Sequence, residues 1–555
     1  MSEWTIGQVL DAVASAVPDR EMTICGDRRS TFAESALRTR RLANFLADKG
    51  FGVRTPNAEL RRWECGQDRV ALLMHNDLYL DVMIGCLKAR TVPVNVNPHY
   101  TAHEVADLLA YLRPSAVVYH RKFGPTLAEA LPDRAGLLII AVEDGTDIAH
   151  LPDAVPFDQA VAEGDPDRVI ETSPDDLAML CTGGTTGRPK GVLWRQADLY
   201  VSSMNGSDHE SIDVLHAFAR ATGQKWFAMS PLSHAAGVFT SCSGLLAGQS
   251  IVLYDDRERF DARVALATAE REQVALMTMV GDAYAAPLVA ELRTRSYELA
   301  SLFGVATGGA ATNPLYKRQL LELLPHVTLV EGYGSSETGG MGFGRSTKDA
   351  PVETFAPMPG GTAISADRTR FLTPGEPEIG WAARVGRVPL GYFDDRDATV
   401  RTFPEIDGQR MAVPGDRVTV DADGTIRLLG RDSLVVNTGG EKVFVEEVEE
   451  VLRACPGVTD ALVVGRPSSR WGTEVVALVQ TVSGEAETET LRAVCRQRLA
   501  GFKVPKQFVP VAGIRRLGNG KPDYRWASAR ASAAADVESA REIPAREIPG
   551  REIGA

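Results

Sequence analysis

A run of glycines and threonines with a lysine is the segment of this chain best suited to binding phosphate. An apolar run at 177–181 precedes it and predicts a buried strand. Glycines let backbone N–H groups close on anionic oxygens, and threonine hydroxyls and a lysine ammonium add donors and charge. The order of residues differs from a Walker loop, in which lysine directly follows glycine and opens a helix. The alternative is a glycine-rich turn between two strands. The residues concerned are Thr182, Gly183, Gly184, Thr185, Thr186, Gly187 and Lys190.

Further short motifs follow the loop along the chain, and their order matters more than any one of them. Together with the loop they resemble the motifs of the adenylate-forming superfamily, which contains acyl- and aryl-CoA synthetases, peptide-synthetase adenylation domains and beetle luciferases. Segments 67–73 and 94–98 also look like this family, so the resemblance covers nearly the whole chain. The motifs are Pro-Leu-Ser-His-Ala-Ala-Gly at 231–237, Gly-Gly-Ala at 308–310, Glu-Gly-Tyr-Gly-Ser-Ser-Glu at 331–337, Gly-Asp at 415–416, Gly-Arg-Asp at 430–432, Gly-Gly-Glu-Lys at 439–442 and Gly-Lys at 520–521.

The resemblance implies an ATP site assembled from several loops. The phosphate loop would hold the β- and γ-phosphates, Tyr333 would stack on adenine, and Asp416 would accept hydrogen bonds from the ribose hydroxyls. Glu337 would bind Mg²⁺, which prefers carboxylate and phosphate oxygens, although in isolation it reads equally as the start of a helix. Ser336 would offer its hydroxyl to the α-phosphate. The other residues implied at the nucleotide are Gly308, Gly309, Ala310, Glu331, Gly332 and Arg431.

The resemblance also implies one active site that performs two half-reactions through rotation of a C-terminal domain. Lys521 would bridge the substrate carboxylate and the α-phosphate as a point charge on a flexible stem. Asp432 would be the hinge, and Gly439 and Gly440 would then let the pantetheine arm of CoA pass close to the backbone. His234 would stand between the acyl pocket and the thiol channel. Considered without the resemblance, Lys521 would be a solvated surface lysine, the glycines at 439 and 440 an ordinary turn, and His234 a packed core residue.

The substrate class follows from the residues after His234. Amino-acid-activating relatives place an aspartate directly after this position, whereas here it is followed by Ala235, Ala236 and Gly237. The small apolar segment 230–246 suits a bulky hydrophobic acid. Segments 54–66 and 435–444 resemble actinobacterial fatty-acid and steroid side-chain CoA ligases, so a fatty, steroid or terpenoid acid is expected.

The predicted function is therefore an ATP-dependent acyl-CoA synthetase that uses ATP, Mg²⁺ and CoA. An acyl-AMP ligase that loads the pantetheine of a carrier protein is the alternative, and a non-catalytic nucleotide-binding relic is a remote one. Retention of Lys521, Glu337 and Asp416 argues against the relic. A homodimer is left open.

Composition narrows the class of protein further. The net charge of −13 disfavours a general nucleic-acid binder, because phosphate backbones need a basic face. The sequence contains no run of eighteen apolar residues, so no membrane span is expected. The first residues lack the basic and apolar regions of a signal peptide. The seven cysteines show no C-x-x-C spacing, which indicates reduced thiols and a cytoplasmic location.

The chain as a whole reads as an α/β protein of more than one domain. Short apolar strands alternate with helical patterns, which predicts parallel-rich sheets covered by helices. Residues 1–431 form the expected AMP- and acyl-binding domain, with a small β-rich part at about 351–424. A mobile α+β domain is expected at 432–528. Residues 529–555, which repeat Arg-Glu-Ile-Pro, are expected to be disordered.

Overall fold

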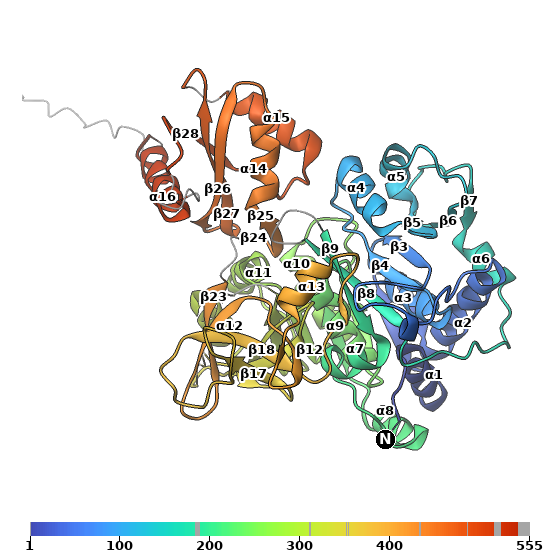
Figure 1. The fold of residues 1–555 in the computed structure, drawn as a ribbon. Coiled ribbons are helices and arrows are strands. Elements are labelled where there is room, and N and C mark those ends of the chain that lie inside the picture. The colour runs from blue at the N-terminus through green and yellow to red at the C-terminus, as the bar shows by residue number, and fades with distance from the viewer. Residues whose placement is uncertain are drawn as a thin grey trace, which may run out of the picture. The chain divides into compact units, whose positions relative to one another are not determined.

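The computed structural model describes residues 2–183, 189–309, 312, 314–350, 352, 354–431, 435–484, 487–515 and 523–541 (Figure 1). The chain divides into two compact units, the first ending at residue 433 and the second beginning at residue 434. The predicted α/β class is confirmed. The predicted domain boundary at 431/432 stays a prediction, because residues 432–434 lie outside the described residues.

One sheet of the first unit contains β8 and β9, the two strands that flank the phosphate loop. Its strands pair in the order β19-β9-β8-β4-β3-β5-β6-β7, parallel from β8 to β7 and antiparallel at β9 and β19. Parallel neighbours need crossover connections, and α3 and α4 lie in two of them. The strands are β3 (Arg69–Leu73), β4 (Val92–Asn95), β5 (Ala116–His120), β6 (Leu138–Val142), β7 (Ala154–Pro156), β8 (Leu177–Gly183), β9 (Pro189–Arg195) and β19 (Gly391–Tyr392).

In a second sheet of the first unit, two strand ends lead into motifs: β10 into the motif at 231–237, here called the acyl-side motif, and β13 into the motif at 308–310, here called the adenine-side motif. Its order is β16-β15-β14-β13-β12-β10-β11-β1-β2, parallel from β14 to β1 and antiparallel at its edges. The strands are β1 (Glu21–Cys25), β2 (Arg28–Thr31), β10 (Lys225–Ala228), β11 (Ser250–Leu253), β12 (Leu276–Met279), β13 (Gly304–Gly308), β14 (Thr328–Ser335), β15 (Gly339–Ser346) and β16 (Ala356–Pro357).

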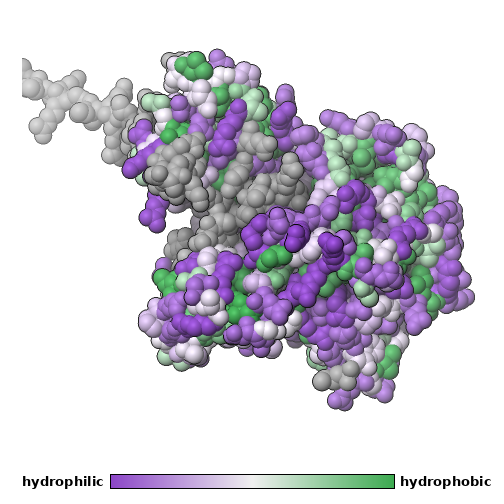
Figure 2. All heavy atoms as spheres, in the orientation of Figure 1, coloured by the Kyte–Doolittle hydropathy of each residue, from purple (hydrophilic) through white to green (hydrophobic). Residues whose placement is uncertain are grey.

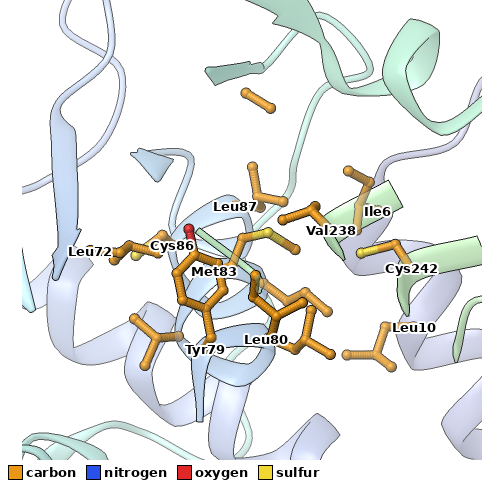
Figure 3. Close-up of a cluster of buried hydrophobic side chains, with 14 of the residues drawn as sticks. Ile6, Leu10, Leu72, Tyr79, Leu80, Met83, Cys86, Leu87, Val238 and Cys242 are labelled. Carbon is orange, nitrogen blue, oxygen red and sulfur yellow. The ribbon is translucent and has the colours of Figure 1, made fainter. Parts of the chain in front are cut away.

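Helices cover both faces of each sheet, because strand side chains alternate between the faces. On β3, Val70 and Leu72 point into the core shared with α1–α3 and α9, whereas Ala71 and Leu73 point toward α4 and α5. The shared core lies between the two sheets, and Figure 3 shows α3 side chains meeting α1 and α9 within it. Helices α10–α12 cover the outer face of the second sheet. These helices are α1 (Ile6–Ala16), α2 (Phe32–Asp48), α3 (Tyr79–Lys88), α4 (Ala102–Leu112), α5 (Gly124–Ala130), α9 (Ala235–Leu245), α10 (Ala262–Glu272), α11 (Asp282–Thr294) and α12 (Pro314–Leu323).

Two helices of this unit begin at capping boxes. Thr31 and Thr101 cap α2 and α4, each with a glutamate three residues later that bonds back to the cap nitrogen. The remaining helices of this unit are α6 (Phe157–Glu163), α7 (Gln196–Ser203), α8 (Ile212–Ala221), α13 (Arg396–Thr402) and the short 3₁₀ turns at Asn57–Glu59 and Arg121–Phe123.

A small antiparallel sheet occupies the region predicted to be β-rich. Its strands pair in the order β20-β21-β18-β22-β23, and β17 also pairs with β18. Met341 of β15 belongs to its hydrophobic core, so the small sheet packs against the edge of the second sheet. The strands are β17 (Gly361–Ile364), β18 (Gly380–Val385), β20 (Glu405–Ile406), β21 (Gln409–Ala412), β22 (Asp416–Val420) and β23 (Ile426–Arg431).

The second unit is a small α+β fold. The β24–β25 hairpin precedes a sheet ordered β26-β27-β28, which has α14 and α15 on one face and α16 on the other (Figure 1). The elements are β24 (Val435–Thr438), β25 (Glu441–Phe444), α14 (Val445–Arg453), β26 (Val458–Ser468), β27 (Gly472–Thr481), α15 (Thr488–Arg498), β28 (Gln507–Pro510) and α16 (Tyr524–Arg541).

Helix α16 corrects the expectation that disorder begins at residue 529. The helix continues to Arg541, and Ala527 and Ala531 are buried against β26 and β27. Small alanine side chains allow this close approach, and the Arg466 guanidinium donates to the Ala531 carbonyl at 3.0 Å. Residues 542–555 of the predicted tail lie outside the described residues.

The face shown in Figure 2 is mainly hydrophilic, with hydrophobic residues interspersed. Within the described ranges, every helix is too short or too polar to cross a bilayer.

Candidate functional site

Asn95 bonds to β8, the strand that leads into the phosphate loop. Strands β8 and β9 run antiparallel into the loop, pairing Thr182 with Lys190. The Asn95 side chain accepts from the Cys181 N–H at 2.8 Å and donates to the Cys181 carbonyl at 3.0 Å and to the Ser233 carbonyl at 2.7 Å. It therefore ties the strand before the loop to the segment before His234. The sequence did not indicate this role for Asn95, beyond placing a polar residue at the end of an apolar strand.

The acyl-side motif forms a tight turn and the first turn of α9. The Asn76 amide accepts from the Leu232 N–H at 2.9 Å, which fixes this turn from the other side. His234 is the N-cap residue of α9, and Ala235, Ala236 and Gly237 begin the helix. A Cβ at Gly237 would lie 2.3 Å from the Pro231 carbonyl oxygen, so only glycine fits there. The described geometry thus presents small residues and no carboxylate at 235–237.

The residues predicted to bind adenine and ribose lie together. The Tyr333 hydroxyl donates to Asp416 Oδ2 at 2.8 Å, and Asp416 is only 5% exposed. The Tyr333 ring packs against Phe355 with centroids 5.7 Å apart, a contact that the sequence did not indicate. Asp416 pairs in register with Arg431 across β22 and β23. The aromatic ring and the carboxylate are therefore positioned by each other.

Glu337 and Lys190 both contact Tyr392, a residue that the sequence did not indicate as part of the site. The Tyr392 hydroxyl donates to Glu337 Oε1 at 2.9 Å, and Lys190 Nζ lies 5.2 Å from the centroid of the Tyr392 ring. Lys190 also forms an ion pair with Asp395 at 3.3 Å. Ser336 is buried, and its carbonyl accepts from Trp194 Nε1 at 2.9 Å. The strand that leaves the phosphate loop thus contacts the predicted metal-binding segment directly through Trp194, and Lys190 and Glu337 each contact Tyr392.

The chemistry of these donors fits Mg²⁺ bound with phosphate. Within the described part of the chain, no group of three or more His, Cys, Asp or Glu residues is arranged to hold a metal ion. Glu337 would therefore have to share the ion with phosphate oxygens, as Mg²⁺ commonly does in nucleotide sites.

The adenine-side segments contain a second charge pair. Glu331 Oε2 accepts from Lys317 Nζ at 2.9 Å, and Lys317 comes from α12. Glu331 and Gly332 lie on β14 beside Thr307 and Gly308 of β13. Gly309 follows with a φ of 78°. These predicted residues are therefore adjacent, and Lys317 is an addition that only the fold reveals.

In the second unit, Gly439 and Gly440 form a tight hairpin turn. Their φ angles are 58° and 84°, and the flanking Thr438 and Glu441 pair directly, as in a two-residue turn that needs left-handed residues. The Gly439 N–H donates to the Trp471 carbonyl at 3.1 Å. Lys506 and Arg470 lie over the Trp471 ring, and burial together with neighbouring arginines lowers the pKa of Lys506. A cationic aromatic surface that the sequence did not indicate therefore borders the turn.

Several predicted site residues lie outside the described residues. They are Gly184, Thr185, Thr186, Gly187, Ala310, Asp432 and Lys521.

Known families and proteins match nearly the whole chain. Residues 10–376 match the model of the AMP-binding enzyme family, and residues 447–521 match the model of the AMP-binding enzyme C-terminal domain. The chain is 42% identical over 542 residues to the medium-chain acyl-CoA ligase Mig of Mycobacterium avium, covering 95% of this chain and 98% of the relative. It is 36% identical over 546 residues to a medium/long-chain-fatty-acid–CoA/3-oxocholest-4-en-26-oate–CoA ligase of Mycobacterium tuberculosis H37Rv, covering 95% and 96%.

Solved structures agree on the fold. The amide bond synthetase McbA from Marinactinospora thermotolerans matches with a TM-score of 0.74 and 22% identity, covering 94% of this chain and 99% of that one. A Mycobacterium tuberculosis fatty acyl CoA synthetase matches with a TM-score of 0.62 and 21% identity, covering 96% and 99%.

Proposed function

This chain belongs to the AMP-binding, adenylate-forming enzymes and is an acid–thiol ligase of the acyl-CoA synthetase type, and from that premise we propose that it activates a medium- to long-chain fatty acid or a steroid side-chain acid. The observation that carries this proposal is the run of small residues at the start of α9, where no carboxylate is offered to a substrate ammonium. The names of the relatives at 42% and 36% identity point to the same acids.

The first half-reaction makes an acyl adenylate. A carboxylate oxygen of the acid attacks the α-phosphorus of ATP, and the bond to the pyrophosphate oxygen breaks. Two anions meet in this step, so catalysis depends on positioning and on fixed positive charge. Lys190 is the described cation beside the phosphate loop, and the proposed bridging cation is Lys521. Mg²⁺, bound by Glu337 and phosphate oxygens, would neutralise charge on the triphosphate.

The nucleotide is proposed to bind across Tyr333 and Asp416. The hydroxyl bond between them at 2.8 Å holds the ring and the carboxylate in one arrangement before ATP arrives. A preformed carboxylate suits the paired hydroxyls of ribose, and a preformed ring suits adenine stacking. Less ordering is then required on binding.

The second half-reaction transfers the acyl group to CoA. The thiolate sulfur attacks the acyl carbonyl carbon, the bond to AMP breaks, and the thiol proton passes to solvent. The hairpin turn at Gly439 and Gly440 is proposed to border the pantetheine arm, since residues without side chains leave room for it. Asp432 remains the proposed hinge between the two arrangements. All seven cysteines are free thiols, which supports the proposed cytoplasmic location.

A substrate panel tests the proposal directly. Pyrophosphate release and acyl-CoA formation are measured with short, medium and long fatty acids, aryl acids and a steroid side-chain acid, each with and without CoA. We expect thioester formation with medium- and long-chain fatty acids or with the steroid acid. Acyl-AMP without acyl-CoA would favour the carrier-loading alternative. Absence of pyrophosphate release with every acid would contradict the proposed function.

A further inference from the structure

Tyr392 joins three parts of the first unit that are far apart in sequence. Strand β19 pairs with β9, placing Tyr392 opposite Val192 and close to the exit of the phosphate loop. The residue is 7% exposed. The hydroxyl reaches Glu337 Oε1 at 2.9 Å, and the ring lies under the Lys190 ammonium at 5.2 Å. One side chain therefore contacts both charged groups expected at the triphosphate.

The surroundings hold the Tyr392 ring in place. Its backbone N–H donates to Thr399 Oγ1 at 2.9 Å, and its ring packs against Phe403 with centroids 5.6 Å apart. Asp395 caps α13 through Oδ1, which accepts from the Ala398 N–H at 2.8 Å. Its other oxygen holds Lys190 at 3.3 Å. The anchor of Lys190 is thus itself fixed at a helix start.

We propose that Tyr392 is a positioning residue that keeps the Glu337 carboxylate and the Lys190 ammonium apart and correctly aimed at the triphosphate. This inference rests on the proposed function, because it concerns the same site. Glu337 and Lys190 carry opposite charges and both contact Tyr392, and a direct ion pair between them would take both charges away from the phosphates. Among the described residues, Lys190 pairs with Asp395 and not with Glu337. No other described hydrogen bond reaches the Glu337 carboxylate, so Oε2 is the oxygen left for a divalent cation.

Replacing only the hydroxyl tests this role. Tyr392→Phe keeps the ring under Lys190 and removes the bond to Glu337. With a non-hydrolysable ATP analogue present, we expect Mn²⁺ affinity, measured by electron paramagnetic resonance, to fall about 10-fold, as for loss of a group that orients a metal ligand. The Mg²⁺ concentration for half-maximal pyrophosphate release should rise by a similar factor. Thioester formation from supplied acyl-AMP should be unchanged.

A matched control shows whether the loss of Mn²⁺ affinity depends on the place of Tyr392 or follows from the loss of any tyrosine–glutamate hydrogen bond. Tyr297→Phe removes the same kind of bond, from a tyrosine hydroxyl to Glu291 Oε1 at 2.6 Å, and no described hydrogen bond or ion pair joins either residue to Tyr392, Glu337 or Lys190. This variant should bind Mn²⁺ like the wild type.

A double-mutant cycle identifies the partner. Glu337→Asp keeps a carboxylate but shortens it beyond reach of the hydroxyl, so adding Tyr392→Phe should cause no further loss of Mn²⁺ affinity. Unchanged Mn²⁺ affinity in Tyr392→Phe, equal losses in both half-reactions, or an undiminished effect in the Glu337→Asp background would overturn the inference. Mn²⁺ binding needs no acid. An enzyme that activates no hydrophobic acid but shows the Tyr392 effect would therefore contradict the proposed function alone.

Discussion

Single side chains set the electrostatics of the nucleotide site by holding one another. Tyr333 and Asp416 are 83 positions apart in the sequence and share a hydrogen bond, and the same is true of Tyr392 and Glu337, 55 positions apart. In each pair a neutral phenol donates to a carboxylate, which orients the acid without cancelling its charge. A lysine in either place would form an ion pair and reduce the charge available to a ligand.

Removing the Tyr333 hydroxyl should weaken ATP binding selectively. In Tyr333→Phe the buried Asp416 loses a donor, at a cost of about 1–3 kcal/mol. We therefore expect the KM for ATP to rise roughly 10-fold while the KM for the acid stays unchanged. Steady-state kinetics with each substrate varied in turn gives the comparison. Tyr200→Phe, which breaks a 2.8 Å contact with His209 away from the site, is the control. Equal changes in both KM values would argue for a general structural effect.

At the scale of elements, strand ends and tight turns bring the site residues together. Asn95 and Asn76 hold the turn before α9 to the ends of β4 and β3, and Asn95 also bonds to Cys181 of β8, so this strand and the turn are tied together. In the second unit the β24–β25 hairpin presents two glycines at positive φ beside Trp471. A substitution meant to block a ligand path there must also tolerate the left-handed conformation, which asparagine does better than leucine.

The hairpin turn should matter for the thioester step alone. Gly440→Asn adds a side chain without forbidding the φ of 84°, and we expect CoA-dependent turnover to fall at least about 10-fold while acyl-AMP formation is retained. Stopped-flow measurement of each half-reaction separates the two. Gly457→Asn, at a φ of 80° with no atom within 4 Å of the added Cβ, is the matched control in the same unit. Normal CoA turnover in Gly440→Asn would remove the turn from the proposed channel.

At the scale of the whole molecule, a buried cluster of charged residues around Asp77 joins the two large sheets of the first unit. Asp77 follows β3 of one sheet and accepts from Arg257, which follows β11 of the other, at 2.9 Å. His120 Nε2 lies 2.8 Å from Oδ1, the other carboxylate oxygen of Asp77. The Asp77 side chain is 2% exposed, so its charge is balanced almost entirely by protein groups. The cluster therefore contributes to the stability of the first unit as a body.

Acid should weaken this junction. Burial alone would raise the pKa of Asp77, but His120, Arg257 and Arg28 outweigh it and lower the pKa to about 2 from 3.8. A depressed pKa contributes stability above pH 3.8 that is lost as the pH falls toward 2, and the shift corresponds to roughly 2 kcal/mol. Asp77→Asn should lower the urea concentration at the unfolding midpoint at pH 7. The difference in this midpoint between the variant and the wild type should become smaller below pH 4. The exposed Asp213→Asn should do neither. A difference independent of pH would refute the assignment.

Domain alternation predicts that the two half-reactions separate in Lys521→Ala. The proposed lysine acts only in the adenylating arrangement, so acyl-AMP formation should fall at least about 100-fold while thioester formation from supplied acyl-AMP is retained. Single-turnover assays of each step give the result, with the exposed Lys348→Ala as control. Equal loss in both steps would remove Lys521 from the bridging role.

The sequence alone determined the fold class, the family and the local elements that carry its motifs. The capped helices α2 and α4, the strand before the phosphate loop and the amphipathic helix α14 depend on neighbours a few residues away, and such patterns are legible in one dimension. Only the tertiary structure decided that Tyr392 lies between Lys190 and Glu337, that Asn95 ties Cys181 to Ser233, and that α16 packs on β26. These contacts join segments that are far apart in the sequence, and no local pattern predicts them. They arise because strand order and the packing of helices and sheets bring distant segments together.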